Sequence, residues 1–235
     1  MHTAGQIKKI PWDSKVFGIN CYEITTLSRE NLNRAGKIPG HYTVKVNPLT
    51  PKRILFDCGF YYCDTLVEAS CAKNDFTYFP DKRVFISRQT PPADLIRIST
   101  GAFRHGRFHR DFNIATKFAD ARYNRWLKEL CRRKTVLGLI FDNTLAGFFA
   151  YQNNRIALHA ISKKFRGRGL AKYLWSAACV ELFKEHKQLT VTFSLANMPI
   201  MNVYAKLGFK FKSAKDVYHK YTGETEPKYR AGKKP

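Results

Sequence analysis

The carboxyl-terminal part of the chain, from about residue 99, alternates between two hydrophobic periods. Apolar side chains at helical spacing predict amphipathic helices, and β-rich runs between turn residues predict strands. The predicted elements are a helix over 113–133, strands over 135–141, 145–152 and 155–161, a helix over 169–187, a strand over 189–195, a short helix over 199–207 and a strand over 209–221. Turn sequences at 142–144 and 153–154 make the first three strands an antiparallel meander.

The amino-terminal part is less periodic. Its candidate elements are strands over 21–25, 42–46 and 61–68 and helices over 29–36 and 51–58. Residues 87–98 contain Pro91 and Pro92 and predict a linker. We therefore expect an amino-terminal domain over 1–95, a second domain over 96–222 and a basic, frayed tail over 223–235.

One segment of the amino-terminal part is similar to a segment of the second half. Residues 54–60 end in Gly-Phe and precede a predicted strand, as residues 203–209 do. A helix that ends in Gly-Phe before a strand is common, so the similarity fits either a repeated fragment or a coincidence.

Size and composition indicate a globular protein. A chain of 235 residues, 44% of them hydrophobic, can bury a substantial core. No run approaches the ~20 apolar residues of a membrane-spanning helix, because Asp142 and Asn143 interrupt the most apolar region, 135–151. Residues 1–11 contain no apolar segment of signal-peptide length. We expect a cytoplasmic protein without membrane insertion.

The six cysteines form neither a CxxC pair nor a zinc-finger spacing with histidine. We expect reduced, mostly packed thiols and no metal.

The net charge is strongly positive. The 41 Lys and Arg residues exceed the 18 Asp and Glu residues, which gives +23. Such a surface attracts anions, so an anionic ligand or partner is expected. The positive charge alone does not distinguish between nucleic acid, an acidic membrane surface, coenzyme A and a nucleotide sugar, which all carry phosphates. A solvated basic surface without a specific partner explains the charge equally well.

A glycine-rich segment, residues 166–171 (RGRGLA), lies between a predicted strand and a predicted helix. Small residues let the backbone approach a ligand closely, and free amide groups at the start of a helix attract an anion. The segment predicts a pyrophosphate site. A glycine-rich helix cap without a ligand is the alternative.

This segment resembles the RxxGxA motif of the GCN5-related N-acetyltransferases, which binds the pyrophosphate of coenzyme A. A second motif of that family, an Asn followed seven residues later by Tyr and then by Gly-Phe, is present in residues 197–209. The resemblance implies an α/β (α+β) fold with a mixed, mostly antiparallel central sheet flanked by helices. It implies acetyl-CoA as co-substrate, and it is compatible with an amino-terminal domain that is a truncated half of the same kind. The residues that it implies for acetyl-CoA binding are Ile161, Arg166, Gly167, Arg168, Gly169, Leu170, Ala171, Lys172, Asn197, Asn202 and Tyr204.

Acetyl transfer to an amine needs donors for the tetrahedral oxyanion and a proton for the departing thiolate. By the resemblance, Tyr204 supplies that proton, Asn197 orients the pantetheine arm, and backbone amides of the strand ending at Ile161 meet the thioester carbonyl. His159, on the same strand, is a candidate base that takes a proton from the amine directly or through water. A packed histidine and a buried core tyrosine are the alternative interpretations.

Residues 11–18 (PWDSKVFG) resemble the WDSxFFG opening of the dTDP-fucosamine N-acetyltransferases, which make precursors of surface polysaccharide, including the lipopolysaccharide O-antigen. Position 16 is Val where Phe is usual. Weaker similarity continues through Arg107-Phe108 and Asp111 to residues 217–220. This resemblance implies acetyl transfer to the amino group of a nucleotide-linked amino sugar of the dTDP-4-amino-4,6-dideoxyhexose type. The candidate acceptor-binding residues are Trp12, Asp13, Arg104, Arg107 and Asp111, with Arg110 as a further phosphate contact.

Two other functions stay open. One is acetylation of a protein or peptide amine, and the other is a basic nucleic-acid-binding module on the same scaffold. The basic residues are dispersed and not interleaved with aromatic residues, which argues against specific nucleic-acid binding. The sequence leaves open the sugar stereochemistry, the nucleotide, the acyl length and a homodimer in which a second subunit completes a partial amino-terminal sheet.

Overall fold

The computed structural model describes residues 7–223. The tail predicted for 223–235 lies outside this range, apart from Gly223. The chain divides into two compact units. Unit one comprises Met1–Leu66, His105–Arg122 and Ala214–Pro235, and unit two comprises Val67–Arg104 and Tyr123–Ser213.

These units do not follow the domain boundary that the sequence predicts near residue 95. Three chain segments build unit one, and two of them follow the predicted boundary at residue 95. The reason is strand pairing, because residues 216–222 pair with residues 40–46 near the amino terminus. A boundary drawn along the chain misses such a discontinuous unit.

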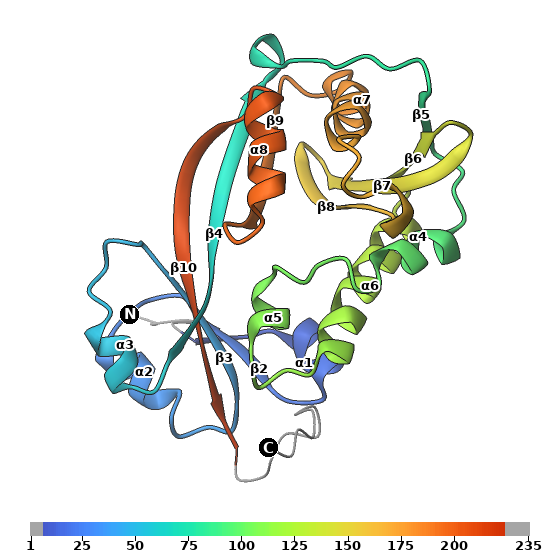
Figure 1. Cartoon of the computed structure of the whole chain (residues 1–235). Coiled ribbons are helices and arrows are strands. Elements are labelled where there is room, and N and C mark those ends of the chain that lie inside the picture. Colours follow the sequence, from blue (N-terminus) through green and yellow to red (C-terminus); the bar gives the residue numbers. More distant parts are fainter. Residues whose placement is uncertain (1–6, 224–235) are drawn as a thin grey trace. The chain divides into compact units, whose positions relative to one another are not determined.

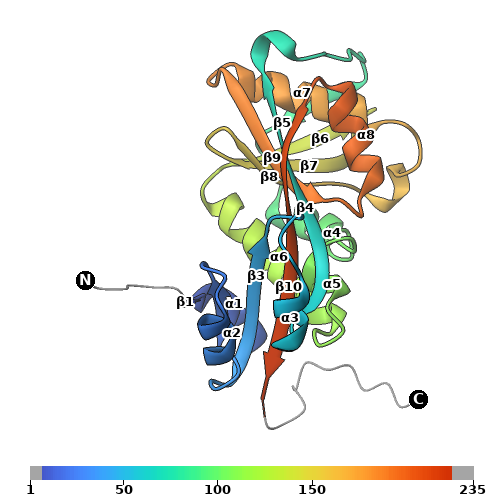
Figure 2. The same cartoon turned by 90° about the vertical axis from the view of Figure 1, so that its left-hand side faces the viewer.

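Unit one contains a short sheet with helices. Its strands pair in the order β1-β2-β3-β10-β4. β2 and β3 are parallel, whereas β1 with β2 and β3 with β10 are antiparallel. β3 and β10 run side by side in Figure 2. The elements are β1 (Ile7–Lys9), α1 (Pro11–Phe17), β2 (Cys21–Ile24), α2 (Arg29–Arg34), β3 (Gly40–Val46), α3 (Arg53–Asp57), the first half of β4 (Tyr61–Ala72), α5 (Arg107–Arg110), the start of α6 (Thr116–Arg132) and the end of β10 (Lys210–Thr222).

Unit two contains the larger sheet, with strands in the order β10-β4-β9-β8-β7-β6-β5. Helix α7 lies on one face of β6 to β8, and α4 lies on the other face (Figure 1). Its further elements are β5 (Val84–Ser87), α4 (Pro92–Ser99), β6 (Val136–Phe141), β7 (Thr144–Gln152), β8 (Arg155–Ile161), α7 (Ala171–Phe183), β9 (Gln188–Ser194) and α8 (Met198–Lys206), with the short 3-10 turns Lys73–Asp75 and Lys163–Phe165.

The antiparallel meander predicted from the sequence is confirmed. β6 pairs with β7, and β7 pairs with β8, both antiparallel. The turn residues Asp142, Asn143 and Asn153 have φ values of 49°, 58° and 52°, which Asn and Asp tolerate better than most residues. The mixed, mostly antiparallel sheet flanked by helices follows from these pairings.

The predicted linker over 87–98 is wrong for most of its length. Residues 92–99 form α4, with Pro92 in its first turn and Leu95 only 2% exposed. Proline is well tolerated in the first turn of a helix, so the Pro-Pro pair that suggested a linker starts a helix instead. The sequence also missed β1, α1, β5 and α5, which are short and carry little periodicity.

Each unit has an apolar core. Leu32, Tyr42 and Leu55 are fully buried in unit one, and Leu127 and Phe148 are fully buried in unit two. Five of the six cysteines are buried, which confirms the prediction that most of them are packed. Within residues 7–223, no helix combines the length and the apolar character that a membrane crossing requires.

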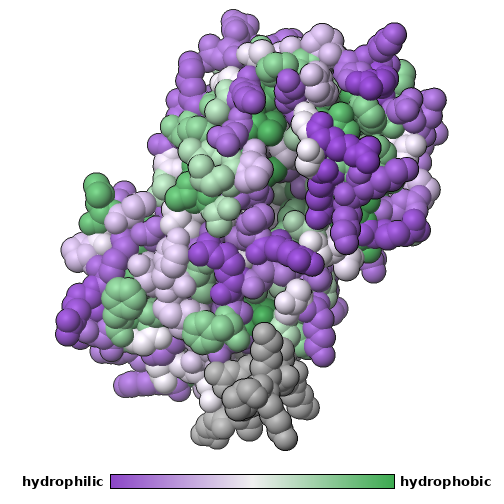
Figure 3. All heavy atoms as spheres, in the orientation of Figure 1, coloured by the Kyte–Doolittle hydropathy of each residue, from purple (hydrophilic) through white to green (hydrophobic). Residues whose placement is uncertain are grey.

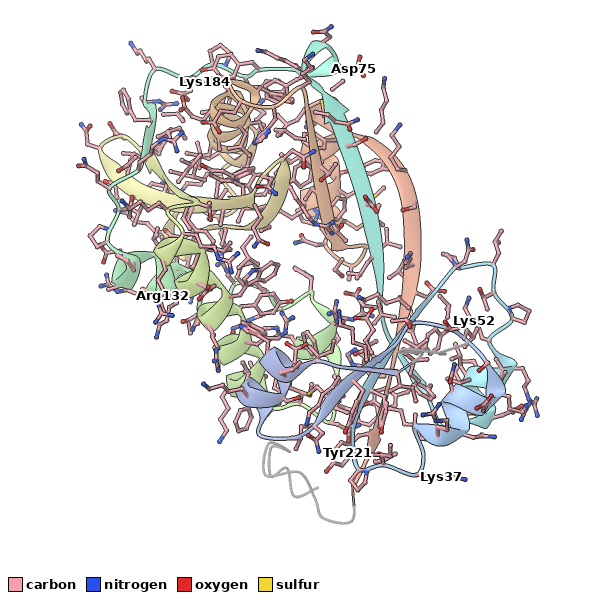
Figure 4. The ribbon with its side chains drawn as sticks, turned by 180° about the vertical axis from the view of Figure 1, so that it is seen from behind. Lys37, Lys52, Asp75, Arg132, Lys184 and Tyr221 are labelled. Carbon is pink, nitrogen blue, oxygen red and sulfur yellow. The ribbon has the colours of Figure 1, made fainter. Side chains whose placement is uncertain are left out.

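The basic side chains are spread over the surface. Hydrophilic residues cover much of the visible face in Figure 3, with apolar patches between them. Lys37, Arg132 and Lys184 lie at the periphery in Figure 4, and the last two side chains are 79% and 62% exposed. A solvated basic surface therefore accounts for part of the net charge.

Candidate functional site

Strands β8 and β9 of unit two separate after a short pairing. Both strands have seven residues and run parallel, but their ladder contains only the pairs Arg155↔Thr190 and Ile156↔Val191. From Ala157 onward, the edge of β8 that faces β9 makes no ladder pair in the described chain. The two strands therefore leave a wedge with unpaired backbone groups.

The backbone of Ile161 faces this wedge. The N–H of the next residue, Ser162, donates to the carbonyl oxygen of Ala146 on β7 at 2.8 Å. Successive backbone groups of a strand alternate in direction, so the N–H groups of Ile161 and His159 point to the β9 side. The carbonyl oxygen of Ile161 accepts a bond from Nε of Arg166 at 2.8 Å. Its N–H is thus the donor that stays available at the end of β8.

The glycine-rich segment forms an open loop between β8 and α7. Gly167 and Gly169 have φ values of 75° and 70°, which other residues adopt only with strain. A Cβ added to either glycine would meet no atom within 4 Å. The surface above the loop is therefore open to a ligand.

The amino end of α7 offers unused backbone donors. The residue before the helix, Leu170, makes no side-chain capping bond. Among residues 7–223, no acceptor lies within hydrogen-bond distance of the N–H groups of Gly169, Leu170 and Ala171. Free N–H groups and the positive end of a 13-residue helix together suit an anion.

The charged side chains near this loop have different partners. Arg166 is tied to β8 as described, and the guanidinium of Arg168 lies 5.8 Å from the ring centre of Phe165. The ammonium of Lys172 lies over two rings, 5.3 Å from the centre of Phe79 and 4.8 Å from that of Tyr173. The two arginines are exposed and Lys172 is half-buried.

Tyr204 of α8 lies in the core of unit two with no exposed surface. Its hydroxyl is 2.8 Å from Nε2 of His159 on β8. Aromatic rings surround the pair, with Trp175 4.5 Å from the ring of His159 and Phe209 4.8 Å from that of Tyr204, centre to centre. The structure thus joins the two residues that the sequence proposed for catalysis.

Burial sets the protonation of this pair. It lowers the pKa of His159 to about 4, so the imidazole is neutral near pH 7. Burial, with a smaller contribution from Cys179, raises the pKa of Tyr204 well above 10, so the phenol keeps its proton. The other ring nitrogen of His159, Nδ1, is buried and has no hydrogen-bond partner among the described residues.

Asn197 and Asn202 belong to the start and middle of α8. Asn197 directly precedes the helix, and its backbone oxygen accepts bonds from Ile200 and Met201 at 3.0 and 3.2 Å. Its side chain makes no hydrogen bond within the described residues. Asn202 is exposed.

Four of the five residues predicted to bind the acceptor lie in unit one, and Arg104 does not. Arg104 is an exposed residue of unit two. Asp13 is 9% exposed and accepts a bond from Nε of Arg122 at 2.8 Å. The guanidinium of Arg122 also lies 5.1 Å from the ring centre of Trp12. Sequence reasoning missed Arg122, because its role depends on a partner 109 positions away.

Asp111 is the centre of a buried polar network in unit one. It is 1% exposed, and its Oδ2 lies 2.8 Å from Nε2 of His41 and 2.7 Å from Nδ1 of His219. Its Oδ1 accepts bonds from the hydroxyl of Tyr61 at 2.9 Å and from the backbone N–H of Asn113 at 2.8 Å. Four donors therefore surround one carboxylate.

These donors keep Asp111 ionised. Burial alone would raise its pKa, but the hydrogen bonds from His219 and His41 outweigh burial and hold the pKa well below its usual value. Burial lowers the pKa of His219 to about 3, although the bond to Asp111 acts in the opposite direction. A neutral His219 thus donates its Nδ1 proton to the Asp111 carboxylate.

The same network borders a cavity of about 180 Å³ in unit one. Its polar and aromatic lining includes Asp13, Glu23, His41, Arg107, Phe108 and Arg122. The nitrogen and oxygen atoms of His41, Asp111 and His219 also lie within 4.8 Å of one another, a spacing that could hold a metal ion. Here both imidazoles bind the same carboxylate oxygen directly.

Comparison with known proteins finds a family for part of the chain. Residues 113–221 match the family model described as acetyltransferase (GNAT) domain. Residues 113–221 therefore form an acetyltransferase domain of the GNAT superfamily, a class whose domains use acetyl-CoA. A search of the curated proteins found no match.

Solved structures share the fold at low sequence identity. A GCN5-related N-acetyltransferase from Sphaerobacter thermophilus has a TM-score of 0.59 and 10% identity, over 92% of this chain and 76% of that one. A tandem GNAT protein from the clavulanic acid pathway has a TM-score of 0.51 and 14% identity, over 87% and 76%. A glucosamine N-acetyltransferase region of a fungal β-N-acetylglucosaminidase has a TM-score of 0.57 and 12% identity, over 77% and 25%.

Proposed function

We propose that this protein transfers the acetyl group of acetyl-CoA to the amino group of a nucleotide-linked amino sugar by direct attack of the amine on the thioester. The observation that carries the acetyl-CoA part is the early separation of β8 and β9, which leaves the N–H of Ile161 unpaired beside an open, glycine-rich loop.

The residues of unit two suit acetyl-CoA. The N–H groups of Gly169, Leu170 and Ala171 would hold the pyrophosphate, since they have no acceptor of their own and stand at the positive end of α7. The side-chain amide of Asn197 has no partner in the described residues and would hold the amide groups of the pantetheine arm. When bound, acetyl-CoA supplies an activated acyl group as a thioester.

The residues around the wedge would stabilise charge and supply a proton. The N–H of Ile161 would donate to the thioester carbonyl and bind it more strongly as negative charge develops on that oxygen. Tyr204 keeps its proton at neutral pH and can donate it to the departing thiolate, while the attacking amine releases one proton to water, from which Tyr204 is protonated again. His159, through Nε2, holds the Tyr204 hydroxyl at 2.8 Å, so we assign it the positioning of Tyr204.

The acceptor assignment has separate support. The WDS segment resembles the opening of the amino-sugar enzymes, and Trp12, Asp13, Arg107 and Asp111 all belong to unit one. Asp13 and Arg107 line its cavity, which offers carboxylates for amino and hydroxyl groups and guanidinium groups for phosphate. We place the enzyme in the synthesis of surface polysaccharide precursors on this resemblance.

The test is thiol release from acetyl-CoA with a panel of acceptors. The panel contains dTDP-4-amino-4,6-dideoxyhexoses, the corresponding uridine nucleotides and basic peptides. We expect turnover with amino-sugar nucleotides and none with peptides. Turnover with peptides alone would overturn the sugar assignment, and turnover with neither, together with no binding of acetyl-CoA, would overturn the acetyl transfer.

A further inference from the structure

Strand β5 forms the outer edge of the sheet of unit two. It is the last strand in the sheet order and pairs with β6 alone among the described strands (Figure 1). An edge strand presents unpaired backbone groups on its open side, and these groups can pair with another extended chain. No residue of β5 belongs to the acetyl-CoA site.

The open side of β5 carries free backbone groups. The carbonyl oxygen of Arg83, directly before β5, accepts a bond from the N–H of Asp142 at 2.9 Å. Because bonded residues alternate along an antiparallel ladder, Val84 and Ile86 then direct their backbone groups away from β6. The N–H of Val84 donates to Asp81 at 2.9 Å, but its carbonyl oxygen and both groups of Ile86 have no hydrogen-bond partner within residues 7–223.

A groove of about 360 Å³ lies beside this edge. Residues of β5 form one wall, and Ala177 and Val180 of α7 form another. Tyr78 and Phe85 also line the groove, although these residues are 51% and 54% exposed. An engineered cavity of about 150 Å³ in another protein holds a benzene ring, so this groove has room for two apolar side chains of a ligand.

The groove has a surplus of positive charge. The charged residues that line it, that bond to its lining or that flank β5 within three positions are Asp81, Lys82, Arg83, Arg88, Glu181 and Lys184. Both carboxylates are already bound, Asp81 by Arg83 at 2.8 Å and Glu181 by Lys184 at 2.6 Å. Four cations thus accompany two carboxylates, and the surplus attracts a negatively charged ligand.

The same charges disfavour a second copy of this chain as the occupant. An antiparallel pair of two β5 strands centred on Ile86 would place Arg88 of each copy beside Arg83 of the other. The net charge of +23 adds repulsion between whole copies. Basic residues next to an edge strand commonly prevent such self-pairing.

We propose that β5 and the adjacent groove bind an extended, acidic segment of a partner protein, which joins the sheet as a further strand. The free backbone groups of Val84 and Ile86 bind its main chain. Successive side chains of a strand point to opposite faces, so alternate apolar side chains enter the groove while acidic ones meet Lys82 and Arg88. This inference does not depend on the proposed function.

The first experiment measures the binding of a fluorescein-labelled peptide of alternating glutamate and valine residues by fluorescence anisotropy. The label caps the amino end, so the peptide offers no amine for acetylation. We expect saturable binding to the wild type that weakens as salt rises, because salt screens the attraction between charges. A matched peptide with lysine in place of glutamate should bind at least about tenfold more weakly. Equal binding of the two peptides, or no binding of the acidic one, would overturn the proposal.

A variant at Ile86 tests the backbone contact. Ile86→Pro removes the outward N–H without removing a bond to β6, and proline is tolerated on the open side of an edge strand. We expect it to weaken binding of the acidic peptide about tenfold, because a peptide carbonyl group loses its donor. Ile86→Val is the matched control, since it keeps the N–H, and it should bind as the wild type does. Equal affinities of the two variants would contradict strand addition.

A measurement on the wild type does not depend on the folding of a variant. The amide hydrogen of Ile86 should exchange rapidly with solvent in the free protein, because it has no acceptor. Saturation with the acidic peptide should slow this exchange at least about tenfold, as followed by NMR. Unchanged exchange at saturation would rule out pairing at this edge.

Sedimentation of the wild type without peptide addresses the other occupant. We expect a monomer, and a dimer that Ile86→Pro dissociates would overturn the proposal and assign β5 to a second copy. Failure of the proposed function gives a different pattern. Peptide binding without thiol release from acetyl-CoA would refute the acetyl transfer and leave the docking surface in place, whereas thiol release without peptide binding would refute the docking surface alone.

Discussion

Two segments of this protein, residues 54–60 and 203–209, have the same local backbone conformation but different side chains. Helix α3 ends before Gly59-Phe60 and β4, and α8 ends before Gly208-Phe209 and β10. The two glycines have φ values of 75° and 88°. In each segment, the phenylalanine N–H donates to the residue five positions earlier, Phe60 to Leu55 at 2.9 Å and Phe209 to Tyr204 at 3.0 Å.

One of the differences lies at that acceptor residue. Leu55 and Tyr204 are both fully buried, so both pack in a core. Only Tyr204 carries a hydroxyl, and only that hydroxyl reaches a histidine. The glycine and the burial of the phenylalanine fix the local backbone, whereas only the second segment places a hydroxyl beside a histidine.

The two units also stabilise buried histidines in different ways. In unit two, His159 meets a neutral hydroxyl among aromatic rings, and burial lowers its pKa to about 4. In unit one, His41 and His219 donate to an ionised carboxylate. Buried histidines therefore contact a hydroxyl in unit two and a carboxylate in unit one.

Removal of the carboxylate should break the network of unit one. We expect Asp111→Ala to lower the free energy of unfolding by about 3–5 kcal/mol, because it leaves buried donors without an acceptor. Urea unfolding measures this change. Asp75→Ala is the control, since Asp75 pairs with Lys210 at the surface and is labelled in Figure 4. A similar loss of unfolding free energy in both variants would show that the contacts of Asp111 stabilise the protein no more than a surface ion pair does.

Removal of the Tyr204 hydroxyl should leave α8 without a proton donor, as α3 is with Leu55 at the corresponding position. We expect Tyr204→Phe to lower turnover about 100-fold while the affinity for acetyl-CoA stays nearly constant, since the ring still fills its site. Steady-state kinetics and calorimetric binding separate the two quantities. Tyr151→Phe, at a hydroxyl bonded to Arg88, should leave turnover unchanged. If Tyr204→Phe retains full turnover, another group supplies the proton.

The buried histidines should make the protein sensitive to acid. Folding lowers the pKa of His159 to about 4 and that of His219 to about 3, from 6.5. The unfolded chain therefore binds more protons below pH 6.5, and the stability that is fully present above pH 6.5 is lost as the pH falls toward these folded values. Each proton contributes a slope of about 1.4 kcal/mol per pH unit.

A variant tests this slope. His159→Gln should reduce the pH dependence of the free energy of unfolding between pH 6 and 4.5 by about one proton, measured by urea unfolding. His105→Gln, at an exposed histidine, should not change it. An unaltered slope in His159→Gln would mean that His159 titrates alike in the folded and unfolded chain.

Two glycines with similar positive φ values allow the effect of a substitution on stability to be separated from its effect on acetyl-CoA binding. Gly59→Ala and Gly169→Ala should each destabilise the protein by about 1 kcal/mol, because both positions have positive φ. Only Gly169→Ala should also raise the KM for acetyl-CoA. An equal KM in the two variants would remove the loop after β8 from acetyl-CoA binding.

Much of unit two could be predicted from the sequence. The meander, α7 and α8 carry strong local periodicity, and the glycines of the loop and the Asn-Tyr-Gly-Phe spacing lie within short stretches. Their geometry follows from neighbouring residues, so Ile161, Gly169 and Tyr204 could be proposed without a structure.

Several helices and strands of unit one could also be predicted from the sequence, but its buried polar contacts could not. Asp111 meets His41 across 70 positions and His219 across 108, and no local pattern links residues so distant. The same holds for Arg122 with Asp13 and, in unit two, for Tyr204 with His159. The sequence by itself determined the local elements and the glycine-rich loop before α7, because both depend on nearby residues. Only the tertiary structure decided which buried polar groups share a partner, because the chain must first fold back on itself to satisfy them.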